Sequence, residues 1–383
     1  MQTVQHTVDV CVVGGGLSGL CAAVAAARQG ASVVLMHDRP VLGGNASSEI
    51  RVWVQGAYGS WDASVRETGL IEEIMLDTLA GNPGCSWSLW DLALHALAQR
   101  QPGLTTLLNC ACVAGEVEGL RVRGVRGWQG TTQTWHEVHA TQFIDASGDS
   151  ILAMLSGAEV RRGREAASEF REPDASAAAS DITMGNSLLF IWRDMGSPQP
   201  FHAPDWAYRY PTEAEAPRHP AYFHASSPNG GDGSFYVETG GRLDTIHDAE
   251  ALREELLKIG LGLVDHLKNH GDHGMEQLNL EWFGMLPGKR ESWRYVGDVV
   301  FTENDAAQGT VFPDIVAYGG WPIDDHHPDG TLSREGDSDH VWHKVACPYG
   351  IPYRALYSRS HDNLLCAGRN ISATHLGLCT TRV

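Results

Sequence analysis

A glycine turn near the start of the chain constrains the fold more than any other feature. Residues 8–13 form a short apolar run, and Gly14, Gly16 and Gly19 follow it in the spacing G-x-G-x-x-G. The alanine-rich residues 20–28 predict a helix directly after the turn. A buried strand, a tight glycine turn and a helix form the first half of a βαβ unit, whose backbone N–H groups and helix N-terminus point at a pyrophosphate. The turn therefore predicts a dinucleotide site, with a plain glycine turn of another α/β fold as the alternative.

Length and charge narrow the class of protein and of partner. The 383 residues suffice for two or three domains, and 43% hydrophobic with 20% charged residues is ordinary for a globular protein. The net charge of -19 argues against nucleic acid or a membrane surface as a partner. The chain begins almost on its first strand and has no apolar run approaching about 20 residues, so we expect neither a signal peptide nor a membrane span.

Cysteine and histidine usage indicates a reducing compartment and no metal centre. The eight cysteines are scattered without a C-x-x-C pair, and the 18 histidines include no H-x-x-x-H zinc helix with a glutamate. We therefore expect a cytoplasmic protein that binds a small molecule. A homo-oligomer is left open.

The second expected strand, residues 32–36, ends at His37 and Asp38. A dinucleotide fold places an acidic or polar side chain at this point to bind the adenosine ribose. Histidine stands where we expect glutamate, although an imidazole can also hydrogen-bond a hydroxyl group.

A second glycine pair follows in residues 39–49, which read RPVLGGNASSE. Gly43 and Gly44 offer further backbone N–H groups, and Asn45, Ser47 and Ser48 offer side-chain donors. These donors favour the pyrophosphate and ribityl chain of FAD over a plain NAD site. A solvated loop is the alternative.

Helices and strands are expected to lead the chain back to the same sheet. A capping box at Ser64 and Glu67 predicts a helix that stops near Gly81, and Ser88 is expected to cap the next helix. The expected strands are residues 104–109, 113–117, 120–128, 134–138 and 142–146. The last of these strands ends in Ser147, Gly148 and Asp149, a small-residue turn that lets the backbone approach a cofactor.

After residue 161 the sequence is more polar and less regular. We expect polar loops over residues 161–180 and 322–330, and an irregular segment rich in proline, aromatic residues and histidine over residues 196–229. The expected strands are residues 187–192, 234–238, 280–286 and 363–368, with an amphipathic helix over 248–270. Ser372 is expected to cap the final helix, whose N-terminus would stabilise negative charge on a reduced flavin.

Six motifs, taken in order, resemble those of a known family. They are VVGGGLSGL at 12–20, RPVLGGNASSEIR at 39–51, FIDASGDS at 143–150, LPGKRES at 286–292, PYGIPYR at 348–354 and NLLCAGRNISATH at 363–375. Together they resemble the FAD-dependent oxidoreductase family and, more broadly, the glutathione-reductase-type FAD fold. The chain departs from the pattern at His37 and at Val383, where the last helix stops about three turns in.

The resemblance implies FAD as a cofactor, which we take to be non-covalent. It assigns the pyrophosphate to the first three glycines, the adenine to the backbone of Val113 and the flavin border to residues 368–375. The motifs and the resemblance together predict these cofactor-binding residues: Gly14, Gly16, Leu17, Ser18, Gly19, His37, Asp38, Arg39, Gly43, Gly44, Asn45, Ser47, Val113, Ala146, Ser147, Gly148, Asp149, Gly368, Arg369, Ser372 and His375.

The expected fold is α/β, with a Rossmann-like FAD/NAD(P)-binding domain of the glutathione-reductase type. An α+β substrate domain on a mixed β-sheet is inserted into it. The FAD-binding domain would comprise residues 1–163 and 341–383, and the substrate domain residues 164–340.

Hydride transfer to a flavin needs a base within hydrogen-bond reach of the substrate's leaving proton. His375 is the first candidate because the last strand and turn place it near the flavin, although it can instead simply pack or bond the cofactor. His327, on an expected loop beside His326, is the second candidate. Arg290 and Glu291 follow an expected strand of the substrate domain, where Arg290 can bind a substrate oxygen or the reduced flavin or form a structural ion pair. Tyr353 can line the pocket or simply pack.

The first functional hypothesis is an FAD-dependent dehydrogenase or oxidase that acts on a small polar molecule. A sugar or glycoside is one such molecule, because four tryptophans can form a surface on which a sugar ring stacks. Packing in the core is the alternative role of these residues, which are Trp192, Trp282, Trp293 and Trp321. The other hypotheses are a flavin monooxygenase or NAD(P)H-dependent flavin reductase, and an FAD-fold protein without catalysis that acts as an interaction module. A second G-x-G-x-x-G unit for a nicotinamide is absent from the sequence.

Overall fold

The computed structural model describes residues 2–54, 56, 65–219, 234–333 and 340–382. Its largest sheet has seven strands. Six of them follow the spatial order β3-β2-β1-β6-β5-β4, and the seventh, β17, pairs with β6. These strands are β1 (Gln2–Val13), β2 (Val33–Met36), β3 (Leu104–Leu107), β4 (Cys110–Glu118), β5 (Arg121–Gln129), β6 (Thr134–Asp145) and β17 (Leu364–Cys366). The strands β1, β2, β3, β6 and β17 are parallel, whereas β4 and β5 form an antiparallel edge.

Strand β6 organises this sheet, and it corrects one expectation. Residues 134–138 and 142–146 were expected as two strands, but they form one strand that pairs with β1 along its whole length. On its other side, β6 pairs first with β5 at residues 134–139 and then with β17 at residues 143–145. The late strand thus joins the sheet where β5 leaves it.

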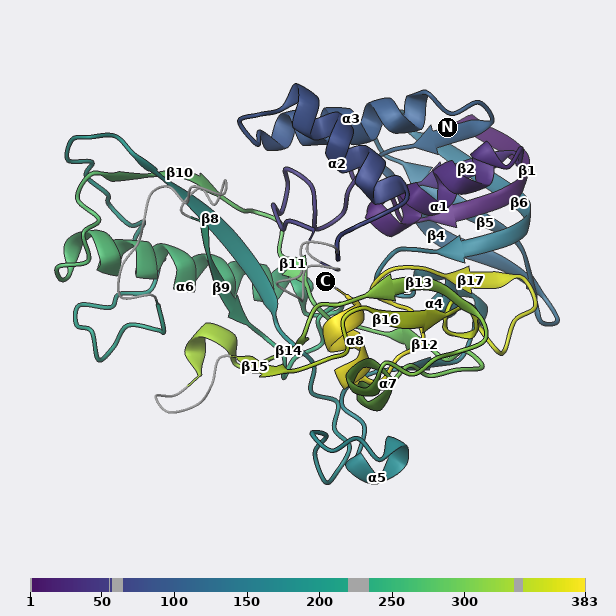
Figure 1. The fold of residues 1–383 in the computed structure, drawn as a ribbon. Coiled ribbons are helices and arrows are strands. Elements are labelled where there is room, and N and C mark those ends of the chain that lie inside the picture. Colours follow the sequence, from purple (N-terminus) through teal and green to yellow (C-terminus); the bar gives the residue numbers. More distant parts are fainter. Residues whose placement is uncertain (1, 55, 57–64, 220–233, 334–339, 383) are drawn as a thin grey trace.

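Helices cover both faces of the sheet. Alternate residues of β2 point to opposite faces, so Val33 and Leu35 pack in one cluster and Val34 and Met36 in another. The first cluster includes residues of α1 (Leu17–Arg28), α2 (Leu70–Gly81) and α3 (Trp87–Gln99), and the second includes residues of α4 (Ile151–Ser156) (Figure 1).

The helix starts differ from the expected caps. The N-cap of α2 is Gly69, and Ser64 of the expected capping box lies outside the described residues. Ser86 rather than Ser88 is the N-cap of α3.

A second sheet lies on the opposite side of the molecule, packed against a long helix (Figure 1). Its central strand β8 (Asn186–Asp194) pairs with β9 (Ser234–Thr239), β10 (Leu278–Phe283) and β11 (Gly288–Lys289). The apolar face of α6 (Ala249–Asn269) packs against β8 and β9 through residues such as Leu256, Leu263 and Val237.

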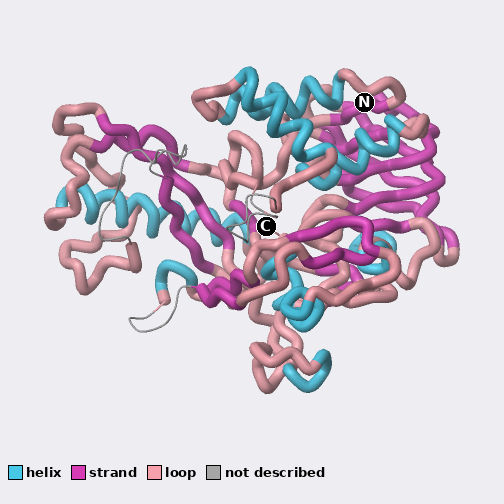
Figure 2. The backbone as a smooth tube through the Cα atoms, in the orientation of Figure 1, coloured by secondary structure: helices cyan, strands magenta, loops and turns pink. Residues whose placement is uncertain are grey.

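Short elements join the two sheets, and one of them, α5 (Ala167–Phe170), projects below the rest of the molecule (Figure 1 and Figure 2). The others are β7 (Val160–Arg161), β12 (Arg294–Tyr295), α7 (Glu303–Gln308), β13 (Ile315–Gly319), β14 (Ile323–His326), η1 (Gly330–Leu332), β15 (His340–His343), β16 (Tyr349–Pro352), η2 (Tyr353–Ala355) and α8 (His375–Thr381). Two expectations are wrong here. His326 belongs to a strand instead of a loop, and the N-cap of the final helix is Thr374 instead of Ser372.

The eight cysteines, all of which lie in the described part of the chain, are free thiols. Among the described helices, none is both long and apolar enough to cross a bilayer.

The first glycine of the turn has a backbone that other residues cannot easily adopt. Gly14 has a φ of +104°, and a Cβ added there would lie 2.3 Å from the Ala146 carbonyl oxygen. Gly30, with a φ of +91°, serves as a matched control because a Cβ added there would meet nothing within 4 Å.

We expect Gly30→Ala to destabilise the protein by about 1–3 kcal/mol through backbone strain alone. Gly14→Ala adds a collision between backbone groups and should cost at least about 1–3 kcal/mol more. Urea unfolding of both variants measures the difference. Equal unfolding midpoints would contradict the packing described for Gly14.

Candidate functional site

Four loops converge at the carboxyl ends of β1, β2, β6 and β17. The turn after β1 bonds to the second glycine loop, since Gly43 N–H donates to the Gly15 carbonyl at 2.8 Å. The same turn packs against Ala146 in the loop after β6, and Ser18 lies beside Gly368 in the loop after β17. The structure therefore brings together most of the residues predicted to bind the cofactor.

The two glycine loops lie against each other and present a polar surface at Gly16, which is partly exposed, whereas Gly44 is buried. A Cβ added at Gly16 would find its nearest neighbour, the Cα of Gly44, 3.9 Å away. Gly16 is also the N-cap of α1, whose first turn begins with Leu17 and Ser18 and receives no side-chain cap among the described residues. The N–H groups of such a turn lack intrahelical acceptors and bind anions.

Arg39 adds a cation to this surface. One of its guanidinium nitrogens, Nη2, lies 3.7 Å from the position of a Cβ on Gly44. The other, Nη1, is buried without a hydrogen bond to any described residue, and lies 3.5 Å from a Glu49 carboxylate oxygen. Backbone donors, an uncapped helix start and an unsatisfied guanidinium N–H fit a diphosphate group. FAD therefore fits the donors that this surface presents.

His37 does not face this surface as the sequence suggested. It is buried, its Nδ1 accepts a hydrogen bond from Gly15 N–H at 3.0 Å, and its Nε2 lies 3.0 Å from the Val41 carbonyl oxygen. Burial lowers the pKa of His37 to about 4, so the ring is neutral and its Nε2 donates to Val41. Both ring nitrogens thus hold the glycine turn in place, and neither is left for a ribose. The exposed Asp38 carboxylate next to His37 keeps its predicted ribose role as a prediction.

Asp149 links the sheet to the later motif at residues 286–292. Its carboxylate accepts from Lys289 Nζ at 2.7 Å, Ser292 Oγ at 2.8 Å and Arg369 Nη2 at 2.9 Å. Burial opposes its charge, but Arg369 and Lys289 outweigh that effect and lower the pKa of Asp149. The predicted contact between Asp149 and a cofactor hydroxyl stays a prediction.

Three other predicted residues hold the loops in shape. Asn45 Nδ2 donates to the Lys289 carbonyl at 3.0 Å, and Ser47 Oγ donates to the Gly44 carbonyl at 2.7 Å. Ser147 Oγ donates to Asp145 at 2.6 Å. Arg369 also donates to the Gly148 carbonyl, which places its guanidinium over Gly148.

Val113 lies apart from these loops, in the antiparallel edge of the sheet. It is half-exposed. Cys112 and Ala114 on either side of it pair with consecutive residues of β5, so the pairing skips Val113. A bulge of this kind leaves one residue unpaired. The predicted adenine contact to its backbone remains a prediction.

A buried network of charges surrounds His375. Its Nδ1 lies 3.0 Å from both Glu291 oxygens, and its Nε2 lies 3.1 Å from Asp325 Oδ1. Glu291 also pairs with the fully buried Arg294, and Asp325 pairs with Arg164 at 2.6 Å. Segments far apart in the sequence therefore meet in one ionic cluster.

This network determines the protonation of His375. Burial alone would lower its pKa, but Cys379 and the carboxylates of Glu291 and Asp325 outweigh burial and raise the pKa well above its ordinary value. The opposite charge of His375 and Arg294 likewise lowers the pKa of Glu291 against the effect of burial. An imidazolium with a carboxylate at each nitrogen holds its protons, so this arrangement does not support His375 as a general base.

The N-terminus of α8 is capped by carboxylates and is not open to a flavin. His375 N–H donates to Glu165 at 2.7 Å, and Thr374 Oγ accepts from Gly377 N–H and donates to Glu172 at 2.6 Å. Protein groups thus occupy the N-terminus of α8, where the sequence predicted that the helix would stabilise negative charge on a reduced flavin. Ser372 is fully buried behind the same loop.

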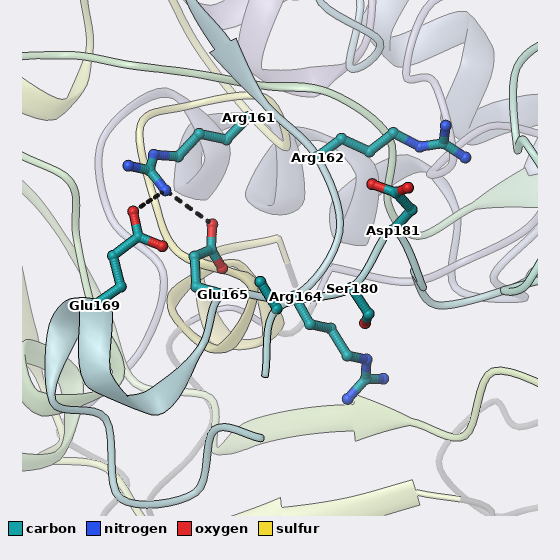
Figure 3. A pocket seen from close by; sticks show the side chains of 8 residues that line it. Arg161, Arg162, Arg164, Glu165, Glu169, Ser180 and Asp181 are labelled. Carbon is teal, nitrogen blue, oxygen red and sulfur yellow. Dashed lines mark ion pairs between the residues drawn. The ribbon is translucent and has the colours of Figure 1, made fainter. Parts of the chain in front are cut away.

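A pocket of about 310 Å³ lies next to this network. Six charged residues line it together with Ala179 and Ser180: Arg161, Arg162, Arg164, Glu165, Glu169 and Asp181. Figure 3 shows Arg161 directed toward Glu165 and Glu169, while Arg162 points away from them. A smaller cavity is lined by both Arg164 and His375, so the pocket adjoins the ionic cluster.

The other predicted catalytic residues are dispersed. Arg290 pairs with Glu238 at 3.2 Å and lies over the Tyr236 ring, which is the structural ion pair considered as its alternative. His327 accepts from Asp329 N–H, and the half-exposed Tyr353 packs against Tyr357.

The four tryptophans proposed for stacking have different neighbours. Trp192 is fully buried in the core between β8 and α6, and the Trp282 ring lies under Arg51. Trp293 lies near Arg162, and Trp321 packs against Trp342.

Sequence reasoning missed the contribution of residues 161–180. This segment was expected to be a polar loop, yet Glu165 and Glu172 are buried and Arg164 is part of the ionic cluster. The sequence signal for buried ion pairs was the high density of opposite charges in this segment. Surface loops have the same composition, so the signal does not distinguish the two. Asp325 and Arg294 were missed because their partners His375 and Glu165 lie far from them in the sequence.

Comparisons with known proteins agree with the cofactor surface. The family model described as FAD dependent oxidoreductase matches residues 9–383. NADH:acrylate oxidoreductase of Vibrio harveyi is 44% identical over 62 residues, which are 16% of this chain and 6% of that protein. The chain therefore matches only a small part of this curated relative.

Solved structures show more distant similarity. A geranylgeranyl bacteriochlorophyll reductase-like protein of Thermoplasma acidophilum is 17% identical, with a TM-score of 0.38 over 78% of this chain and 69% of that chain. Glycerol-3-phosphate dehydrogenase of Bacillus halodurans, complexed with FAD, is 14% identical, with a TM-score of 0.28 over 52% and 43% of the two chains.

The buried Glu291 carboxylate offers a test of the ionic cluster. Glu291→Gln leaves Arg294 and His375 without this counter-charge, and removing one partner of a buried ion pair costs about 3–5 kcal/mol. We expect urea unfolding at pH 7 to show this loss. Glu281→Gln is the control, because its pair with Arg193 is partly exposed and should contribute less than about 1 kcal/mol.

The pH dependence of the same variant follows from the direction of the pKa shift. The pKa of Glu291 is lower in the folded protein than in the unfolded chain, so its stabilisation is present above about pH 4.3 and is lost as the pH falls through the folded pKa. The stability difference between wild type and Glu291→Gln should therefore narrow below about pH 4. A difference that grows on acidification would contradict the pairing.

Proposed function

Since the chain belongs to the FAD dependent oxidoreductase family, we propose that it is a dehydrogenase or oxidase that removes a hydride from a small polar substrate. Its fold is an FAD-binding Rossmann-like α/β fold, and FAD is its cofactor. When bound, FAD supplies the redox step by accepting the hydride. The observation that carries the proposal is the pair of glycine loops at the uncapped start of α1, beside the guanidinium of Arg39.

In this proposal the glycine loops and Arg39 hold the diphosphate of FAD. Gly16 leaves the surface free of a side chain, and the first turn of α1 offers its N–H groups. The partly exposed Arg39 side chain brings its Nη2 next to Gly44, where it would make a charge-assisted bond to a phosphate oxygen.

We also propose the glutathione-reductase type of this fold, with residues 164–340 as an inserted substrate domain. Two observations support the insertion. β17, from late in the chain, pairs with β6 in the first sheet, whereas β8, β9, β10 and β11 form a sheet of their own. Residues 1–163 and 341–383 would together form the FAD-binding domain.

The charged pocket supports a small polar substrate. Its arginines and carboxylates offer hydrogen-bond donors and acceptors together, which suits a molecule with several hydroxyl groups. A sugar or glycoside stays the specific prediction from the sequence.

Within this site we assign His375 a positioning role. It fixes the carboxylates of Glu291 and Asp325, and through Asp325 it orients Arg164, which lines the pocket. A residue that takes the substrate's proton must reach the pocket itself.

A second candidate function is reduction with NADH as the electron donor. It is favoured by the local similarity to an enzyme named NADH:acrylate oxidoreductase, which covers 16% of this chain. The missing second glycine motif counts against a dedicated nicotinamide domain. A third candidate, an FAD-fold interaction module, predicts a protein that binds no flavin.

Binding of FAD tests the cofactor surface. We expect Arg39→Ala to weaken FAD binding by about 10- to 100-fold, because a hydrogen bond to a charged group contributes about 1.5–3 kcal/mol. Quenching of flavin fluorescence in a titration measures the affinity. Arg28→Ala is the control, since Arg28 pairs with Glu73 at the exposed end of α1. A wild-type protein that refuses added FAD would support the interaction module.

Anaerobic reduction tests the activity. The FAD-loaded protein is mixed in turn with sugars, glycosides, hydroxy acids, amines, NADH and NADPH, and loss of the oxidised flavin absorption is followed. We expect one class of polar substrate to bleach the flavin without a nicotinamide. Bleaching by NADH or NADPH alone would replace the dehydrogenase assignment with the reductase.

A further inference from the structure

A cluster of three histidines and one glutamate lies beside α6, apart from the glycine loops. Glu213 and His219 come from the segment before β9, His266 from α6 and His273 from the loop that follows α6. The Glu213 carboxylate lies 3.1 Å from His266 Nε2, 3.3 Å from His219 Nε2 and 3.7 Å from His273 Nε2. One donor atom from each residue lies within 4.8 Å of all the others.

The outer nitrogens of two histidines determine what the inner nitrogens can do. His266 Nδ1 lies 2.7 Å from the Tyr210 carbonyl oxygen, and His219 Nδ1 lies 2.8 Å from the Pro217 carbonyl oxygen. A carbonyl oxygen only accepts, so each Nδ1 carries the proton. In a neutral ring the Nε2 atom then presents a lone pair, and both lone pairs point at the Glu213 carboxylate, which is also an acceptor.

Acceptors that face one another need positive charge between them. Protons can supply it only by charging neighbouring imidazoles, whose ring centroids lie 5.0–5.4 Å apart, and like charges this close repel. A single divalent cation satisfies all four groups at once. His273 supports this reading, because its Nε2 is buried without a hydrogen bond to any described residue.

We propose that Glu213, His219, His266 and His273 bind one zinc ion. Ligands 2.0–2.1 Å from a tetrahedral zinc lie about 3.4 Å apart, close to the spacings between the carboxylate and the three rings. Three imidazoles and one carboxylate suit zinc, whereas calcium and magnesium prefer oxygen ligands throughout. The backbone carbonyls at Nδ1 are the outer partners that orient metal-binding histidines.

The proposed site is structural. With four protein ligands it has no open position for a substrate, and it fastens the segment before β9 to α6. His266 is fully buried, whereas the Glu213 side chain is 70% exposed and leaves the ion an entry side. The site is independent of FAD and of the proposed reaction.

Metal binding to the untagged full chain tests the proposal. We expect the dialysed protein to retain one equivalent of zinc, measured by elemental analysis, after exposure to ZnCl₂. Cobalt(II) in place of zinc should give the intense visible absorption of a tetrahedral site. Added ZnCl₂ should also raise the melting temperature of the chelator-treated protein, because the ion binds the folded state.

Two substitutions, one in the segment before β9 and one in the loop after α6, identify the ligands. Glu213→Gln and His273→Gln should each weaken zinc binding by at least about 100-fold, since even outer partners of a metal site contribute about 10- to 100-fold. His270→Gln is the control, because His270 lies near His266 on the same helix end but pairs with Asp265. Glu213 is exposed, so its variant should fold.

Two outcomes would overturn the proposal. One is a wild-type protein that binds no zinc at micromolar concentration. The other is a Glu213→Gln or His273→Gln variant that folds and binds zinc as tightly as His270→Gln.

Discussion

The buried carboxylate of Glu291 is the point on which the arrangement of the two sheets depends. It is fully inaccessible, and it pairs with Arg294, which is also fully inaccessible, and with His375. A charge in this position is tolerated only when all its partners are present. The residues after β11, strand β12 and the start of α8 must therefore dock together, and Glu165 and Asp325 follow because Arg294 and His375 need them.

The same stretch of chain also fixes the cofactor surface. Two residues before Glu291, Lys289 pairs with Asp149, and its carbonyl accepts from Asn45 and Arg369. The glycine loops, the end of β6 and the loop after β17 are thus connected to the ionic cluster through residues 289–291. These contacts are short and part-buried, and they connect the cofactor surface to the ionic cluster that borders the pocket beside Arg164.

Local patterns predicted the first sheet well, whereas the ionic cluster around His375 depends on contacts that no local pattern encodes. The β1 turn, the helix after it and the second glycine loop each follow from residues that are neighbours in sequence. By contrast, the division of β6 into two strands was wrong because β1 supports the strand across its polar middle residues. Residues 161–180 were misread because Glu165 and Glu172 are buried only through partners more than a hundred residues away.

Histidine shows most clearly why residue type alone could not assign the sites. His37 accepts a hydrogen bond from an N–H group at one nitrogen and donates one to a carbonyl at the other, so it is a neutral support for the glycine turn. His375 meets carboxylates at both nitrogens and is held as a cation. His266 donates a hydrogen bond from Nδ1 to a carbonyl and directs the lone pair of Nε2 toward a carboxylate. A metal ion completes this arrangement. The atoms opposite each ring decide among these three roles, and folding brings those atoms into place from other elements of the chain.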